Sequence, residues 1–283
     1  MTTPAVPTLR RPTRRFGAYV FDLDGTLYLG DQLLPGAAET VASIRDAGAR
    51  VAFLTNKPLE TPAAYADKLT DLGIPAAARE VVSSTDALLH YLERHARGAR
   101  VLPITEPLLV EMLRDHDFET LDPATDDPTT ADVVVVSWDR TFDYAKLLAA
   151  FRAVRAGARI VATNPDPFCP MPDGDLPDCA AMLTAIEACT GARAEAVVGK
   201  PSPHMAEALL DRLALPPDDT ILVGDRLMTD VLMARAAGMA SALVLTGATT
   251  LEALHGAAVI PDYVLGGVAE VLPASDNLPG GSR

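Results

Sequence analysis

The sequence lacks a long apolar run. Although 49% of its 283 residues are hydrophobic, no uninterrupted apolar stretch approaches the roughly 18–20 residues that cross a bilayer. The N-terminal stretch MTTPAVPTLRRPTRR is basic but is followed by no apolar segment, and Asp22 and Asp24 interrupt what comes next. This pattern argues against an export signal. We therefore expect no membrane partner and interpret residues 1–15 as a disordered basic tail.

Positive charge and cysteine are also scarce. There are 24 Lys and Arg against 38 Asp and Glu, which gives a net charge of −14. Such an acidic surface argues against nucleic acid and anionic membranes as partners. The three cysteines, at positions 169, 179 and 189, are not spaced like the close pairs of zinc sites, and an odd number cannot all pair. We therefore expect reduced thiols and a cytoplasmic protein.

Short apolar runs, each followed by a helical pattern, recur at both ends of the chain. Runs without polar alternation are typical of strands that are buried on both faces of a parallel sheet. Helices are expected at 36–48 and 228–238, the second with Thr229 as its N-cap. The alternation predicts a doubly wound α/β core with a parallel sheet. Its expected strands are 18–22, 50–56, 196–200, 220–225 and 241–247.

A second series of strands and helices interrupts the first. Strand-like runs occupy 100–105, 131–138 and 158–164, and helical patterns occupy 86–95, 106–116, 143–157 and 179–191. We therefore predict an inserted α/β domain. The predicted limits are 16–78 for the first part of the core, 79–185 for the insertion, 186–272 for the second part of the core and 273–283 for a flexible tail.

Acidic residues follow two of the expected core strands. In VFDLDGTLY (20–28), Asp22 and Asp24 are two residues apart, so a strand would point both carboxylates the same way. Asp225 ends the run TILVGD, and Asp230 stands at the start of the next helical pattern. Paired carboxylates can act as nucleophile and general acid/base, or can hold a hard cation.

Two further strand ends add a hydroxyl and a cation. RVAFLTN ends with Thr55 and Asn56, and AVVGK ends with Lys200 before the proline-rich PSPHM. The carboxyl ends of parallel strands meet at one edge of a sheet, where ligands bind. Together with the carboxylates, these residues form the set that phosphoryl transfer needs: a nucleophile, metal ligands, a neutralising cation and a hydrogen-bond donor.

The motifs DLDGTLY, FLTNKP, VVGKPSPHM and VGDRLMTDVLMARAAG occur in this order within residues 17–271. In these motifs the chain resembles phosphatases of the haloacid dehalogenase (HAD) superfamily, subclass IIA. That branch contains p-nitrophenylphosphatase-like, nucleotide, phosphoglycolate and pyridoxal-phosphate phosphatases. The resemblance implies a Rossmann-like core with an inserted α/β cap domain of type II. The spacing agrees, because only 28 residues separate Thr26 from Thr55, whereas 143 separate Asn56 from Lys200.

The resemblance implies roles for the motif residues. Asp22 would attack phosphorus and form an aspartyl-phosphate, while Asp24 would serve as general acid and then as general base. Thr55 would hold phosphoryl oxygens, and Lys200 would offset the repulsion between substrate and nucleophile.

The same resemblance implies a Mg²⁺ cofactor. Its ligands would be the Asp22 carboxylate, the Asp24 backbone carbonyl and Asp225, with Asp230 reaching it through water.

Several positions are candidates for contacts with the substrate or depart from the family pattern. Asn56 and Lys57 follow Thr55, and Lys57 adds a cation where many relatives have Asn or Ser. Arg140 is either a solvated loop residue or a substrate contact. Thr141 stands where phosphoglycolate- and pyridoxal-phosphate-type relatives have histidine, so neither substrate is transferred to this chain.

A loop of the inserted domain departs from the pattern as well. Asp178 and Cys179 replace the small residues that are usual in relatives. Asp166 begins the loop, 166–178, that we expect to touch the leaving group. The Thr-Asn pair at 163–164 copies the one at 55–56 but is predicted to shape a turn and not to bind phosphate.

The sequence thus predicts a Mg²⁺-dependent phosphatase for small phosphomonoesters, such as sugar or polyol phosphates. The alternatives are a phosphotransferase of the same fold and a catalytically silent module that binds a phosphorylated ligand. The expected partners are a small phosphorylated metabolite and, by resemblance, a second copy of the chain that contacts the first through the cap.

Overall fold

The computed structural model describes residues 8–169, 174–214 and 216–274. They fall into two units, each of which is described by itself. The first comprises Met1–Thr55, Pro62–Val82 and Leu209–Arg283, and the second comprises Asn56–Thr61 and Ser83–Ala208. The second unit therefore extends to Ala208, beyond the expected limit of the insertion at residue 185.

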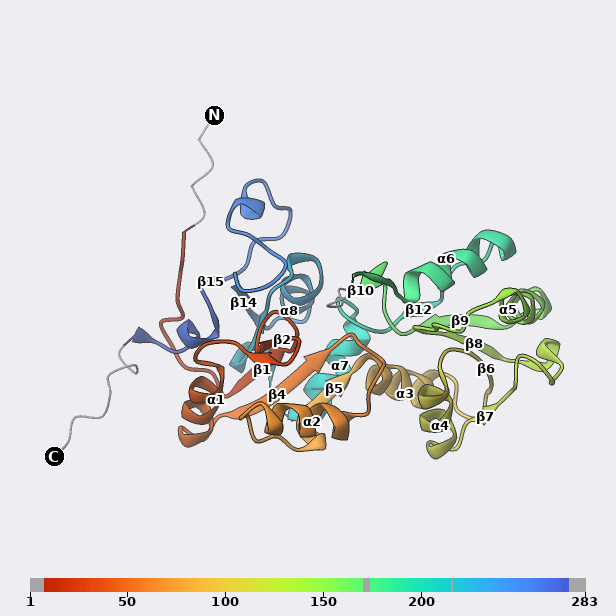
Figure 1. Ribbon diagram of the computed structural model, residues 1–283, viewed down its shortest axis with the longest axis horizontal. Coiled ribbons are helices and arrows are strands. Elements are labelled where there is room, and N and C mark those ends of the chain that lie inside the picture. The colour runs from red at the N-terminus through yellow and green to blue at the C-terminus, as the bar shows by residue number, and fades with distance from the viewer. Residues whose placement is uncertain (1–7, 170–173, 215, 275–283) are drawn as a thin grey trace. The chain divides into compact units, whose positions relative to one another are not determined.

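The first unit is built around a six-stranded sheet of order β15-β14-β13-β1-β4-β5, of which Figure 1 labels β15, β14, β1, β4 and β5. The pairs from β15 to β4 are parallel. Since the chain extends the sheet from β1 first to one side and later to the other, β1 and β13 flank the point at which the order reverses. The strands are β1 (Ala18–Asp22), β4 (Arg50–Thr55), β5 (Val81–Ser83), β13 (Thr220–Gly224), β14 (Ala240–Val244) and β15 (Tyr263–Leu265).

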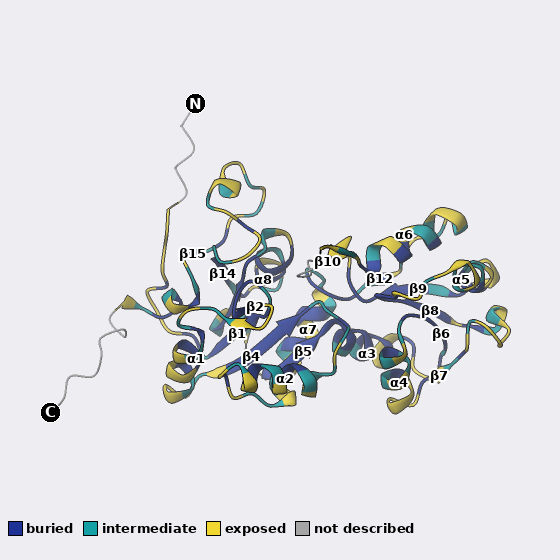
Figure 2. Cartoon of the chain, viewed as in Figure 1, coloured by how far each residue is buried: buried dark blue, intermediate teal, exposed yellow. Residues whose placement is uncertain are grey.

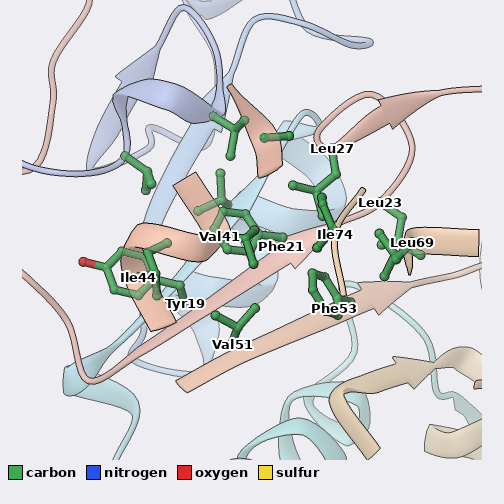
Figure 3. Packing of buried hydrophobic residues seen from close by; sticks show 14 of the residues in the cluster. Tyr19, Phe21, Leu23, Leu27, Val41, Ile44, Val51, Phe53, Leu69 and Ile74 are labelled. Atoms are coloured by element: carbon green, nitrogen blue, oxygen red, sulfur yellow. The ribbon is translucent and has the colours of Figure 1, made fainter. Parts of the chain in front are cut away.

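Both faces of this sheet are buried, as its continuous apolar strands predict (Figure 2). On one face Phe21 and Phe53 pack with Val41 and Ile44 of α1 (Ala37–Asp46) and with Leu69 of α2 (Pro62–Asp71), and Figure 3 shows this packing. The alternate strand residues are buried as well, among them Val20, Ala52 and Leu222. Side-chain burial on two faces is what fixes the sheet as the centre of the unit.

Shorter elements complete the first unit. A hairpin of β2 (Tyr28–Leu29) and β3 (Gln32–Leu33) follows β1. The remaining elements are η1 (Ala78–Glu80), the end of α7 (Pro203–Leu213), η3 (Pro217–Asp219), a π-helical turn (Leu227–Val231), α8 (Leu232–Ala236), η5 (Glu252–Leu254) and η6 (Val268–Glu270).

The second unit contains a five-stranded sheet of order β12-β9-β8-β6-β7, in which neighbouring strands are parallel. The helices and strands expected between residues 86 and 191 are confirmed within one or two residues at most ends. Its strands are β6 (Arg100–Ile104), β7 (Glu119–Thr120), β8 (Val133–Val136), β9 (Arg159–Ala162) and β12 (Ala196–Val197), beside a hairpin of β10 (Phe168–Cys169) and β11 (Leu176–Pro177). Its helices are α3 (Ser84–His95), α4 (Pro107–Asp115), η2 (Pro128–Thr130), α5 (Tyr144–Ala156) and α6 (Cys179–Thr190).

The prediction that the run 196–200 forms a strand of the core sheet is wrong. Only Ala196 and Val197 are extended, and they pair with Val161 and Ala162 of β9 in the second sheet. A short apolar run is equally compatible with either sheet, so the hydrophobic pattern does not determine its partner.

Residues 8–15 of the predicted disordered tail are described by the structure, and they are ordered. Arg10 exchanges two backbone hydrogen bonds with Val264 of the edge strand β15, and Arg11 forms an ion pair with Glu270. The edge strand offers unpaired backbone groups, and the nearby acidic residues complement the arginines. Of the two predicted tails, 1–7 and 275–283 lie outside the described residues. Within the described part of the chain, no helix is both long and apolar enough to cross a membrane.

Candidate active site

Three buried carboxylates converge at the carboxyl edge of the first sheet. Asp22 is the last residue of β1, Asp225 follows β13, and Asp230 lies in the π-helical turn. One oxygen from each lies within 4.8 Å of the others. The convergence follows from the topology, because β1 and β13 are parallel neighbours in which Phe21 pairs with Val223. Three clustered acids repel one another, so the arrangement is suited to hold a cation.

Backbone N–H groups hold two of these carboxylates. Asp225 Oδ2 accepts a hydrogen bond of 2.6 Å from the Ala248 N–H, and Asp230 Oδ2 accepts one of 3.1 Å from the Arg226 N–H. Glycines pack against both side chains: an added Cβ at Gly247 would collide with Asp225 Oδ2, and one at Gly224 would collide with Asp230 Cγ. The carboxylates are therefore fixed by their surroundings before any ligand binds.

The turn that carries Asp230 is wider than predicted. The sequence suggested a helix that begins at Thr229, but the chain forms a π-helical turn from Leu227 to Val231, with Arg226 as its N-cap, and α8 follows. The Asp230 side chain folds back to the Arg226 N–H, and the Thr229 hydroxyl donates to the same oxygen at 3.4 Å. Thr229 therefore supports Asp230 and does not cap a helix. Such π-helical insertions are frequent at functional sites.

Asp24 and Thr55 lie at the same edge as Asp22. Asp24 follows β1 in a tight turn in which the Gly25 N–H donates to the Tyr28 carbonyl at 2.8 Å, and Gly25 adopts a φ of 83° that favours glycine. Thr55 is the buried last residue of β4, and its neighbour Leu54 pairs with Asp22. Burial, and then the charge of Asp24, raise the pKa of the Tyr28 phenol, so this side chain stays neutral.

Lys200 lies in the second unit, where the Asn56 side chain holds its backbone. Asn56 Oδ1 accepts the Lys200 N–H at 2.7 Å, and Asn56 Nδ2 donates to the Lys200 carbonyl at 3.1 Å. The same amide nitrogen donates to Asp166 Oδ2 at 2.9 Å. Both polar atoms of the Asn56 side-chain amide are thus hydrogen-bonded to protein atoms. This geometry favours a positioning role for Asn56 over the predicted contact with substrate.

The second Thr-Asn pair supports the same segment. The Thr163 carbonyl accepts the Gly199 N–H at 2.7 Å, and a Cβ on Gly199 would lie 2.5 Å from that oxygen. Asn164 Oδ1 accepts the Asp166 N–H at 2.9 Å, and Asn164 Nδ2 donates to the Asn56 carbonyl at 3.2 Å. The predicted structural role of this pair is thereby supported, whereas its connection to Lys200 has no signal in the local sequence.

Arg140 and Thr141 lie in a polar network of the second unit. The Arg140 guanidinium donates to both oxygens of Glu106, at 2.5 and 2.7 Å, and these bonds hold the pKa of Glu106 below its usual range. The Thr141 hydroxyl donates a hydrogen bond of 2.7 Å to Asp139 and accepts one of 2.8 Å from Lys146 Nζ. Sequence reasoning missed Glu106 and Lys146 as the partners of these two residues.

Asp178 and Cys179 have structural roles in the second unit. Asp178 is the N-cap of α6 and accepts the Cys179 N–H at 2.6 Å. Burial raises the pKa of Asp178 to about 6, and the negative charge of Asp166 adds to this. The hydrogen bond from the Cys179 N–H opposes it most, and the Asn164 side chain and the charge of Lys57 oppose it less. Burial raises the pKa of the Cys179 thiol to about 11, so the thiol is unreactive near neutral pH. In the predicted substrate loop 166–178, residues 170–173 lie outside the described residues.

Two family models match this chain, and the matched ranges include residues of both units. A haloacid dehalogenase-like hydrolase model matches residues 19–119, and a HAD-hydrolase-like model matches residues 197–271. Sugar-phosphatase AraL of Bacillus subtilis is 37% identical, over 89% of this chain and 90% of that protein. The chain belongs to the haloacid dehalogenase-like hydrolases.

Further relatives place it in the phosphatase branch, as a phosphoric monoester hydrolase. Glycerol-3-phosphate phosphatase of Gallus gallus is 33% identical over 95% of both chains. Among solved structures, 4-nitrophenylphosphatase from Thermotoga maritima has a TM-score of 0.83 at 32% identity and covers 90% of this chain and 95% of its own. NagD from Escherichia coli K-12 also has a TM-score of 0.83, at 29% identity, over 92% and 100% of the two chains.

In this HAD-like hydrolase, Asp178 should make stability depend on pH. Its pKa is 3.8 in the unfolded chain and about 6 when folded, so stability is lost as the pH rises through this window. Asp178→Asn removes that cost and keeps an acceptor for the Cys179 N–H. Its free energy of unfolding should therefore exceed that of the wild type by about 3 kcal/mol at pH 7.5, and by only about 0.5 kcal/mol at pH 4.

Urea unfolding at several pH values measures this difference. Asp143→Asn, the same exchange at the exposed N-cap of α5, is the control and should show no comparable rise. A difference between Asp178→Asn and wild type that stays constant with pH would contradict the prediction.

Proposed function

We propose that this chain is a Mg²⁺-dependent phosphatase that hydrolyses small phosphomonoesters through an aspartyl-phosphate on Asp22. The observation that carries the proposal is the buried cluster of Asp22, Asp225 and Asp230 at the carboxyl edge of the first sheet. Membership of the haloacid dehalogenase-like hydrolases supports it.

The donor set fits magnesium. It consists of carboxylate oxygens, which are hard ligands, and there are few of them, as suits a cation that keeps several of its waters. Asp22, Asp225 and Asp230 would hold the ion, and the Asp24 carbonyl is proposed as a fourth ligand. When bound, the ion would neutralise these carboxylates and offset the negative charge of the substrate.

The chain's own residues account for the remaining steps. A carboxylate oxygen of Asp22 attacks phosphorus while the bond to the ester oxygen breaks, and Asp24 gives its proton to that leaving oxygen. Asp24 then takes a proton from the water that attacks the aspartyl-phosphate, which frees phosphate and restores Asp22. Thr55 donates a hydrogen bond to the phosphoryl group, and the Lys200 ammonium balances its charge.

The substrate is proposed to be a sugar phosphate or a polyol phosphate. Relatives named for a sugar phosphatase activity and for glycerol 3-phosphate span nearly the whole chain, and this supports the choice. Arg140, Thr141, Asp166 and Lys57 remain candidates for selecting among substrates. A homodimer that forms through the second unit also remains a proposal, which light scattering tests.

The experiment is a measurement of phosphate release from p-nitrophenyl phosphate and from a panel of phosphorylated metabolites, with Mg²⁺ and with EDTA. We expect turnover that requires Mg²⁺ and a preference for sugar or polyol phosphates. Absence of phosphate release from the whole panel would favour the silent binding module. Appearance of a phosphorylated alcohol acceptor in place of free phosphate would favour a phosphotransferase.

Gly247→Ala should weaken the binding of Mg²⁺. The added Cβ displaces the Asp225 carboxylate, and loss of such support costs metal sites about 10- to 100-fold in affinity. The measurement is the Mg²⁺ concentration that gives half-maximal activity. Gly267→Ala is the control, because its Cβ would meet Thr246 only at an ordinary 3.5 Å. Equal Mg²⁺ requirements in the two variants would contradict the prediction.

A further inference from the structure

A hollow lined by four arginines lies in the first unit. Its volume is about 430 Å³. Arg45 comes from the last turn of α1, Arg50 is the first residue of β4, Arg79 lies in η1, and Arg212 lies near the end of α7. Four arginines from four separate elements thus gather at one place in a chain whose net charge is −14. Four positive charges so close together repel one another, and a bound anion would relieve this repulsion.

The hollow is separate from the carboxylate cluster. Arg50 pairs with Ala18 at the amino end of β1, whereas Leu54 pairs with Asp22 at its carboxyl end. Four residues of strand separate these two levels, which corresponds to about 13 Å. None of the residues proposed for catalysis is among those that line the hollow. An anion bound there would therefore not be in contact with Asp22.

Backbone carbonyls fix the orientation of three of the guanidinium groups. Arg45 donates to the Pro75 carbonyl, Arg50 to the Leu213 carbonyl and Arg212 to the Val81 carbonyl. A carbonyl is neutral and takes only some of the five N–H donors of a guanidinium. These bonds therefore hold the side chains in place without cancelling their charge, which is the arrangement of a preorganised anion site.

The lining carries one acid against the four arginines. Glu80 accepts hydrogen bonds of 2.8 Å from Arg45 and from the Ala77 N–H, so both of its oxygens are engaged. Arg79 is exposed and, among the described residues, makes no hydrogen bond or ion pair. Its donors are therefore available to a ligand at no cost in broken protein contacts.

The remaining lining is apolar. Val51, Leu209 and Leu213 contribute to it, and they are among the buried residues of the chain. A volume of this size matches the pockets that take small organic molecules and is larger than an inorganic ion needs. The hollow thus combines guanidinium donors for an oxyanion with apolar surface for an organic group.

We propose that this hollow is a second binding site, for a small organic molecule that carries a phosphoryl group. Guanidinium groups bind phosphoryl oxygens through paired, charge-assisted hydrogen bonds, and the apolar residues contact the organic part. The ligand is bound and not hydrolysed there, because the one carboxylate of the lining is held by Arg45 and by a backbone N–H. The proposal rests on the arginines and is independent of the proposed catalytic function.

Phenylphosphonate is a suitable probe, since its carbon–phosphorus bond is not an ester. The titration is done by calorimetry on the full-length protein in EDTA. Without its neutralising cation, the proposed active site should not bind the probe, so the binding that we still expect to detect belongs to the hollow. Arg79→Glu should weaken this binding at least about tenfold. Arg97→Glu is the matched control, since Arg97 is also exposed and is not part of the lining; it should bind like wild type.

Three results would overturn the proposal: equal binding by Arg79→Glu and wild type, equal weakening by Arg97→Glu, or loss of binding in EDTA. Inorganic phosphate tests the organic part of the claim, because it should bind more weakly than phenylphosphonate, and equal affinity would refute that part. Turnover of p-nitrophenyl phosphate without the probe should be the same in Arg79→Glu and wild type, which excludes misfolding as the cause of lost binding.

Discussion

Replacement of Asp22 by asparagine should lower kcat by at least about 1000-fold. The amide has almost the shape of the carboxylate, so the buried site keeps its packing, but its nitrogen and carbonyl oxygen are poor nucleophiles toward phosphorus. One of the three carboxylates that would hold the metal is lost as well. Steady-state release of p-nitrophenol measures the loss, and circular dichroism checks that the variant folds.

Asp31→Asn is the matched control for this prediction. It makes the same chemical change at a side chain that is 96% exposed and that forms an ion pair of 3.3 Å with Lys68. Its kcat should equal that of the wild type. If Asp22→Asn kept more than about a tenth of the wild-type kcat, Asp22 would not be the nucleophile.

Replacement of Lys200 by methionine should lower kcat/KM by about 100- to 1000-fold, the usual cost of removing one group that stabilises transition-state charge. Lys200 is 3% exposed, and methionine fills a similar volume without the ammonium. In the proposed mechanism this ammonium balances the charge of the dianionic substrate, and the variant lacks it. The measurement is kcat/KM for p-nitrophenyl phosphate at saturating Mg²⁺, and a loss of less than about threefold would contradict the assigned role.

Asn56→Ala tests whether Asn56 acts through Lys200. The variant loses both hydrogen bonds to the Lys200 backbone, so kcat/KM should fall about 10-fold or more. In the double variant with Lys200→Met there should be little further loss, because coupled residues are not additive. Ser84→Ala is the control, since it removes a bond of 2.7 Å to the Asn56 carbonyl and leaves Lys200 untouched. Fully additive losses would mean that Asn56 acts independently.

The carboxylate cluster could be predicted from the sequence because its signals are local. Asp22 and Asp225 each end a continuous apolar run, and parallel topology then brings neighbouring strand ends together. For the same reason the apolar pattern predicts β1, β4, β13 and β14 of the first sheet and the helices α3, α4, α5 and α6 of the second unit, whereas the three-residue edge strands β5 and β15 give too short a pattern to be predicted. Hydrophobic periodicity records which faces are buried, and that is sufficient for elements of this length.

The features that were not predicted depend on contacts between distant residues. The run at 196–200 joins the second sheet, although its apolar pattern fits both. Asn56 holds Lys200 across 144 positions, so nothing near either residue reveals the pairing. The sequence likewise gives no signal that Arg45, Arg79 and Arg212 lie close together. The wide turn at Asp230 arises because its carboxylate bonds the Arg226 N–H, which a helical periodicity does not encode.

The chain passes from one unit to the other after Thr55, Thr61, Val82 and Ala208, and this restricts how the units can be recombined between relatives. A chimera that exchanges only 83–208 would keep the short segment 56–61 of its host. In this chimera Asn56 would come from the host, whereas Lys200, Ser84 and Asn164, which contact it, would come from the donor. A transferable module must therefore include both stretches, and chimeras that carry both should express and fold better than chimeras that carry one.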